Sequence, residues 1–313
     1  MNENEKKKFL ETLEPLFKNE IRITPERSET PLPADASKIG GNPSLPKDFV
    51  WPTYAGREEH CFKRDDAYDD DGEPVNINRP LAFLAQFNMK DTAPLDKDGL
   101  LPKTGMLSFF YDLETEPWGI EPEDKGSARV FYFPEVSNLS AADFPEGLYE
   151  EYKLPEYVIK LESHISCPSD DAIKLNTLRI FSRKGLSDMN GEECVNWMTS
   201  AIDEFTSFLD ENGLDVCFES KLLGHSDAIQ SSEKEMAKLC ETVTRGYQFE
   251  SQISDWELVE IADNAPDWIL LFQMHGINGQ LQFGDNGNIY FWIRKQDLAN
   301  KDFSKVWQIL ECD

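Results

Sequence analysis

Two segments of this chain share one strand–loop–strand pattern and lie 187 residues apart, measured from Gln86 to Gln273. In each, an apolar run ends at a glutamine, and an aromatic-rich run follows after a connection. The runs are PLAFLAQ (80–86) with GMLSFFY (105–111), and WILLFQ (268–273) with IYFWI (289–293). Short apolar runs bounded by Gly, Pro or Asn are typical of buried strands. The pattern predicts an internal duplication.

Further elements complete a mixed fold. Strands are expected at 128–133 and 157–161, and helices are expected to begin at Asn190 and Ser232, where a capping residue precedes an apolar stripe. Apolar residues repeat at helical spacing over 5–19, and prolines interrupt 24–53. Asn286 and Gly287 favour a tight hairpin turn between 280–283 and 289–293. Short helical segments are expected around 296–298 and 303–307.

These elements predict an α+β fold of two pseudo-repeated antiparallel β-rich units packed into one compact body, with peripheral helices and an N-terminal helix. The units are an N-terminal helical extension (1–24), a first β-rich repeat (25–150) and a second repeat with helices (151–313). The boundary near residue 150 is nominal, because a duplication whose strands share one sheet has no free linker.

Composition restricts the partners. With 59 acidic and 31 basic residues, the chain has a formal charge of −28, which disfavours nucleic acids and anionic membranes and favours a basic partner. No window approaches the roughly 18 apolar residues of a membrane span, and the N-terminus lacks a signal-peptide pattern, so a cytoplasmic location is expected. Six cysteines without a CxxC pair and four histidines without ligand spacing predict no metal or cofactor.

The stretch 57–79 is densely acidic. As a calcium loop it would place Ala67 at position 1 and Asn78 at position 12, where an Asp and a bidentate Glu are needed, so a solvated surface loop is the better interpretation. Its carboxylates are candidate contacts for a basic partner: Asp65, Asp66, Asp69, Asp70 and Asp71.

Polar residues that punctuate the predicted strands are the only other site candidates: Gln86, His225, Gln230, Gln273 and Asp285. A buried glutamine must satisfy several hydrogen-bonding positions, so Gln86 and Gln273 are expected either to tie loops to the sheet or to line a ligand pocket between the units. An enzyme would use His225 as base with Asp285 as its orienter. No nucleophile elbow or phosphate loop supports catalysis.

The chain resembles the YwqG-like family of bacterial proteins over roughly residues 37–310. The resemblance is carried by IGGNP (39–43), LP (45–46), WP (51–52), PLAFLAQ (80–86), LP (101–102) and FFY (109–111), and later by LLGH (222–225), WILLFQ (268–273), FGDNG (283–287) and IYFWI (289–293). Phe283 stands where Trp is expected, and the acidic insert 57–73 is longer than in relatives. The resemblance implies an α+β fold around a duplicated unit, and no catalytic residues can be transferred. Some relatives accompany secreted-toxin genes, which implies a role in immunity or partner binding.

We therefore expect a non-catalytic binding protein, of immunity type in its sharper form, that engages a basic partner such as a cognate toxin through its acidic surface. The alternative is a small-ligand sensor or an enzyme that uses a pocket between the two units.

Overall fold

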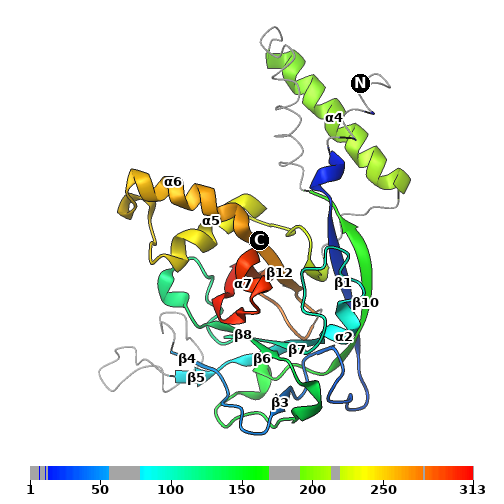
Figure 1. Cartoon of the computed structure of the whole chain (residues 1–313), viewed down its shortest axis with the longest axis vertical. Coiled ribbons are helices and arrows are strands. Elements are labelled where there is room, and N and C mark those ends of the chain that lie inside the picture. The colour runs from blue at the N-terminus through cyan, green and yellow to red at the C-terminus, as the bar shows by residue number, and fades with distance from the viewer. Residues whose placement is uncertain are drawn as a thin grey trace.

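One antiparallel sheet of ten strands organises the fold (Figure 1). The computed structural model describes residues 7, 11, 13–55, 78–168, 191–212, 219–277 and 279–312. In spatial order the strands are β14 (Trp307–Glu311), β13 (Asn288–Arg294), β12 (Trp268–His275), β11 (Ser220–Leu223), β1 (Lys18–Arg27), β10 (Tyr157–Ser166), β2 (Lys38–Ile39), β6 (Ala82–Asn88), β7 (Met106–Tyr111) and β8 (Ala128–Phe133). Two short pairs lie outside this sheet: β3 (Ser44–Pro46) with β9 (Leu139–Ala141), and β4 (Thr53–Ala55) with β5 (Asn78–Pro80).

The long antiparallel pair β1–β10 occupies the middle of the sheet, in register from Lys18 opposite Ser166 to Arg27 opposite Tyr157. Four strands follow on each side, β2-β6-β7-β8 and β11-β12-β13-β14. Strands from both predicted units therefore belong to one sheet. Each side also contains a register irregularity, near Phe83 in β6 and near Leu270 in β12.

The sheet curls so that its two sides share an aromatic core. Phe109 of β7 lies with its ring centroid 4.8 Å from that of Phe272 and 5.1 Å from that of Phe291. All three side chains are fully buried. Such edge and tilted ring pairs contribute about 0.5–1.5 kcal/mol each beyond area burial. The connection after β7 then contacts the opposite sheet edge, where Leu310 donates to the Trp118 carbonyl at 3.0 Å, so the sheet is nearly closed.

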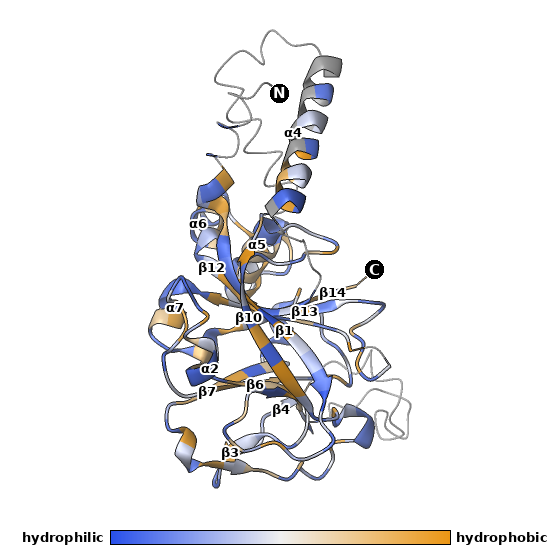
Figure 2. Cartoon of the chain, turned by 90° about the vertical axis from the view of Figure 1, so that its right-hand side faces the viewer, coloured by the Kyte–Doolittle hydropathy of each residue, from blue (hydrophilic) through white to orange (hydrophobic). Residues whose placement is uncertain are grey.

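Helices lie outside the sheet. They are α2 (Met89–Thr92), α4 (Gly191–Asn212), α5 (Glu233–Thr244), α6 (Asp255–Asn264) and α7 (Lys295–Ala299). Short 3-10 turns are η1 (Glu14–Leu16), η3 (Pro122–Asp124), η4 (Val136–Asn138), η5 (Glu150–Tyr152), η7 (Glu250–Gln252), η8 (Ala265–Asp267) and η9 (Phe303–Lys305). Met236, Cys240 and Val243 of α5 pack against Trp268 and Trp292. The helix α4 stands away from the body (Figures 1 and 2).

The structure confirms the strands and helices that were predicted from the strongest local sequence patterns. The strands expected at 80–86, 105–111, 128–133 and 157–161 are confirmed as β6, β7, β8 and the start of β10, and both predicted helices are present. Ser232 forms the expected capping box with Glu235.

Three expectations need correction. The helix expected over 5–19 does not reach residue 19: Lys7, Glu11 and Leu13 are helical where the structure describes this segment, the 3-10 turn η1 follows, and β1 begins at Lys18 because Ile21 and Ile23 alternate at strand spacing and are buried. No strand covers 280–283: Asn286 has φ 54° but Gly287 does not have positive φ, so the connection is a broad loop and not a two-residue turn. The segment 303–307 is only partly helical, because β14 begins at Trp307.

Candidate functional site

Gln86 binds the loop that follows β2. Its Oε1 accepts from the Ser44 N–H at 2.8 Å, and its Nε2 donates to the Ala36 carbonyl at 2.8 Å and to Ser44 Oγ at 3.2 Å. The side chain is fully buried. Ser37 Oγ, beside Lys38, accepts from the Asn88 N–H at 2.9 Å. These contacts hold one loop against the end of β6.

Gln273 makes the corresponding contacts in the other half. Its Oε1 accepts from the Asp227 N–H at 2.9 Å, and its Nε2 donates to the Glu219 carbonyl at 3.2 Å and to Asp227 Oδ2 at 2.7 Å. Ser220 Oγ accepts from the His275 N–H at 3.0 Å. Gln273 is fully buried as well. Both glutamines thus tie loops to the sheet, which is one of the two roles expected from the sequence.

Each glutamine faces a buried lysine that sequence reasoning missed. Lys38 lies opposite Gln86 in the β2–β6 pair, and Lys221 lies opposite Gln273 in the β11–β12 pair. Lys38 Nζ contacts Glu156 Oε2 at 2.5 Å and the Asn42 carbonyl at 2.7 Å. A usable signal was present, because SKIGG (37–41) and SKLLG (220–224) place serine, lysine and glycine at the same spacing.

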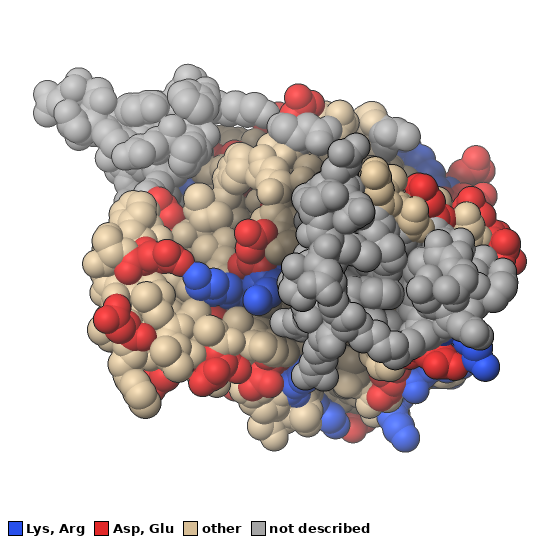
Figure 3. Space-filling model, turned by 90° about the horizontal axis from the view of Figure 1, so that it is seen from above, with Lys and Arg blue, Asp and Glu red and all other residues tan. Residues whose placement is uncertain are grey.

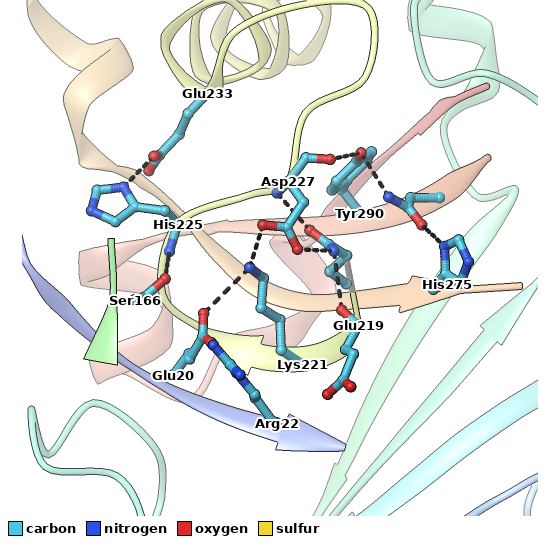
Figure 4. Close-up of polar contacts among 12 residues, drawn as sticks. Glu20, Arg22, Ser166, Glu219, Lys221, His225, Asp227, Glu233, His275 and Tyr290 are labelled. Atoms are coloured by element: carbon cyan, nitrogen blue, oxygen red, sulfur yellow. Dashed lines mark hydrogen bonds and ion pairs between the residues drawn. The ribbon is translucent and has the colours of Figure 1, made fainter. Parts of the chain in front are cut away.

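The second lysine belongs to a larger charged cluster (Figure 4). We name Glu20, Arg22, Lys221, Asp227 and Gln273 the rear cluster. Lys221 Nζ lies 2.7 Å from Asp227 Oδ1 and 3.3 Å from Glu20 Oε2, and Arg22 Nε donates to Glu20 Oε1 at 2.7 Å. Burial acts to raise the pKa of Glu20, but Lys221 and Arg22 outweigh it and the pKa is lowered. Burial raises the pKa of Asp227, against the opposing effect of Lys221.

His225 connects the end of β11 to three other segments. Its Nδ1 lies 2.6 Å from Glu233 Oε2, its Nε2 lies 2.7 Å from the Leu16 carbonyl, and its N–H donates to Ser166 Oγ at 2.9 Å. Burial acts to raise the pKa of Glu233, but His225 and Lys18 outweigh it and hold the pKa at about 2. The carboxylate beside His225 is therefore Glu233, whereas the sequence suggested Asp285.

The remaining predicted residues lie apart from this cluster. Asp285 is exposed in the loop between β12 and β13, and Gln230 is exposed, with its N–H donating to Glu311 Oε2 at 3.2 Å. Asp65, Asp66, Asp69, Asp70 and Asp71 lie outside the described residues. The five candidate ligand contacts therefore do not line one described cavity.

Chemically, the rear cluster is saturated by internal partners. Both carboxylate oxygens of Asp227 and the ammonium of Lys221 are occupied, and none of the four described pockets is lined by these residues. A buried ion pair of this kind orders the chain, because removing either partner leaves an uncompensated charge. Among the described residues, no group of three or more His, Cys, Asp or Glu side chains is placed to hold a metal ion, and no helix is long and apolar enough to cross a membrane.

The helix α6 presents a different surface, which sequence reasoning also missed. Trp256 and Val259, one helical turn apart, are 72% and 52% exposed, and Phe249 in the preceding loop is 57% exposed. We name Phe249, Trp256 and Val259 the α6 surface. The segment 233–267 that contains it holds nine acidic and three basic residues, a net charge of −6. Figure 3 shows carboxylates spread over this end of the molecule.

Comparison with known proteins identifies the family. No curated protein matches the sequence. The profile of a domain of unknown function, DUF1963, matches residues 37–312 and thus spans β2 to β14, including both buried lysines and both glutamines. Because the match covers far more than half of the sequence, this chain belongs to the DUF1963 family.

Proposed function

We propose that this protein is a non-catalytic binding protein that engages a basic protein partner through its acidic surface. The observation that supports the proposal is the α6 surface. Trp256 is 72% exposed on a helix whose inner face already packs on the body, and its indole N–H donates to Glu260 Oε1 of the same helix at 3.1 Å, so most of the ring is left for contact with a partner. Exposed apolar side chains rimmed by charge are characteristic of interaction sites.

The charge around the α6 surface selects the partner. Asp255 and Asp263 are exposed on the same helix as Trp256. Buried tryptophans dominate many interfaces, whereas rim charges mainly accelerate association and reject partners of the same sign. A basic protein with an apolar pocket is the complementary partner.

In its sharper form the partner is a cognate toxin whose basic cleft is occupied by this acidic surface. Asp65, Asp66, Asp69, Asp70 and Asp71 would then form a second contact. An immunity role of this kind is consistent with the resemblance to YwqG-like bacterial proteins. Membership of that group and a cytoplasmic location are therefore part of what we propose.

We also propose that the two halves derive from a duplicated unit. Support comes from the matched contacts: Gln86 and Gln273 each accept from the N–H six residues after the facing lysine and donate to the carbonyl two residues before it. Gly41 and Gly224, three residues after those lysines, both have positive φ. The proposed units are 25–150 and 151–313, preceded by 1–24.

The test is capture of partners from host lysate on the full-length protein, at low and at high salt, followed by a binary affinity measurement with the protein retained. We expect a basic partner that is lost at high salt and that binds at least roughly tenfold more weakly to Trp256→Ala, since a central tryptophan contributes about 2 kcal/mol or more. Trp118→Ala is the matched control, because Trp118 is also exposed. Equal affinity of wild type and Trp256→Ala for the retained partner would refute the α6 surface.

A further inference from the structure

A pocket of about 550 Å³ opens where the two edges of the sheet approach each other. It is lined by β8 from one edge, by Trp307 of β14 from the other, and by η9 and the end of α5. The loop between β7 and β8 lies beside it and is held by the Trp307 indole N–H, which donates to the Gly119 carbonyl at 2.8 Å. Its size suits a small organic ligand.

The charge of this pocket is opposite to that of the chain. Its charged lining residues are all basic: Lys125, Arg129, Arg245, Arg294 and Lys305. The sequence has 59 acidic and 31 basic residues, so a lining of average composition would be mostly acidic. A concentration of cations in one concave site raises the local concentration of anions.

Two of these cations, Arg245 and Arg294, are partly neutralised by neighbouring carboxylates. Glu241 accepts from Arg245 Nε at 2.8 Å and from Arg294 at 2.6 Å, and Glu260 accepts from Arg245 at 2.8 Å. Lys125, Arg129 and Lys305 are exposed and have no carboxylate within 4.0 Å in the part of the chain that the structure describes. Two carboxylates against five cations leave three positive charges in excess.

The same pocket has aromatic walls. Trp268 and Trp307 line it, and both indole N–H groups are already bonded, Trp268 to Glu241 Oε2 at 2.8 Å. These rings can therefore offer only apolar contact to a ligand. The Arg294 guanidinium lies over the Trp268 ring, 5.0 Å from its centroid, which holds this cation at the pocket wall.

We propose that this pocket binds a small phosphate-bearing aromatic molecule. Its phosphate lies among Lys125, Arg129 and Lys305, which donate charge-assisted hydrogen bonds, and its flat body lies against Trp268 and Trp307. The site shares no residue with the α6 surface and does not depend on the protein partner proposed above. It concerns binding alone, and no bond is made or broken.

The test is calorimetric titration of the full-length protein with 1-naphthyl phosphate, inorganic phosphate and 1-naphthol. We expect 1-naphthyl phosphate to bind at least roughly tenfold more tightly than either fragment, because it alone uses both the cations and the rings. The double variant Arg129→Gln/Lys305→Gln should bind it roughly tenfold more weakly or worse. The matched control is Arg27→Gln/Lys47→Gln, which removes the same charge from exposed positions elsewhere and should bind as wild type does.

Equal affinity of both double variants, or equal binding of 1-naphthol and its phosphate, would overturn the proposal, as would no binding at millimolar ligand. Melting of the ligand-free variants at the wild-type temperature shows that any loss of binding is local. Displacement of 1-naphthyl phosphate by AMP would support a nucleotide as the natural ligand, and failure of AMP to displace it would support a carbocyclic aryl phosphate.

Discussion

Replacing Gln86 by leucine tests whether the buried glutamines are structural ties. The change removes four hydrogen bonds at 2.8, 2.8, 3.2 and 3.4 Å and leaves the Ser44 N–H and the Ala36 carbonyl without that partner in the interior. Each unsatisfied buried group costs about 1–3 kcal/mol, while leucine nearly preserves the apolar volume. We expect the free energy of unfolding to fall by about 3–5 kcal/mol.

The assay is thermal and urea unfolding of the ligand-free protein. An unfolding entropy of about 2.1 cal/mol/K per residue over 313 residues converts this loss into a fall of about 5–8 °C in melting temperature. Gln273→Leu should behave similarly, because it releases the Asp227 N–H and the Glu219 carbonyl. Gln282→Leu is the control, since Gln282 is exposed, and it should change stability by no more than about 0.5 kcal/mol.

A Gln86→Leu protein that melts within about 1 °C of wild type would contradict this argument, because the predicted loss of stability requires a larger fall. The ligand-pocket interpretation of Gln86 would then regain weight. Under that interpretation the substitution leaves the free protein stable and removes only the increase in melting temperature that a bound ligand produces.

Three further predictions concern substitutions of single residues. The folded-state pKa of Glu233 is about 2, below its ordinary value, so its contribution to the free energy of unfolding is fully present above about pH 4.5 and is lost as pH falls toward 2. Urea unfolding across that range should show a loss of about 2–3 kcal/mol that is absent in Glu233→Gln. Glu241→Leu leaves Arg294 and the Trp268 indole N–H without their carboxylate partner, although Arg245 keeps Glu260, and should cost about 3–5 kcal/mol in chemical unfolding. Glu250→Gln, at an exposed position, should cost less than about 1 kcal/mol. Gly41 has φ +66°, and an added Cβ would lie 2.5 Å from Glu156 Oε2, whereas Gly99 has φ +69° and open space around it. Gly99→Ala should therefore cost only the backbone penalty of about 1–2 kcal/mol, and Gly41→Ala should lower the melting temperature well beyond it. Equal melting temperatures of the two variants would contradict the steric argument.

Strong local patterns were readable from the sequence alone. The aromatic runs of β6 and β7 and the Ser232 capping box are decided by residues within a few positions of one another. The strand β1 was missed because the apolar residues at helical spacing over 5–19 obscured the alternation of Ile21 and Ile23. That signal lay in the sequence, and strand periodicity over five residues was enough to find it.

The candidate sites depended on contacts that no local pattern contains. Lys221 forms an ion pair with Glu20, which is far from it in the sequence, and His225 contacts Glu233 instead of Asp285. A charged side chain is stable in the interior only when a partner is brought to it, and that partner is chosen by strand order. Likewise, the exposure of Trp256 could not be read from sequence, because its helix has apolar residues on both faces.

By itself, then, the sequence determined the class of fold, most strands, the positions of two helices, one of them with its cap, and an acidic composition, because these follow from composition and short-range periodicity. Tertiary structure alone decided which lysine pairs with which carboxylate and placed five cations from separate segments around one pocket. The physical reason is that both depend on how the ten-stranded sheet curls until its edges approach each other. That closure is settled by packing among Phe109, Phe272 and Phe291, whose contacts join residues more than 150 positions apart.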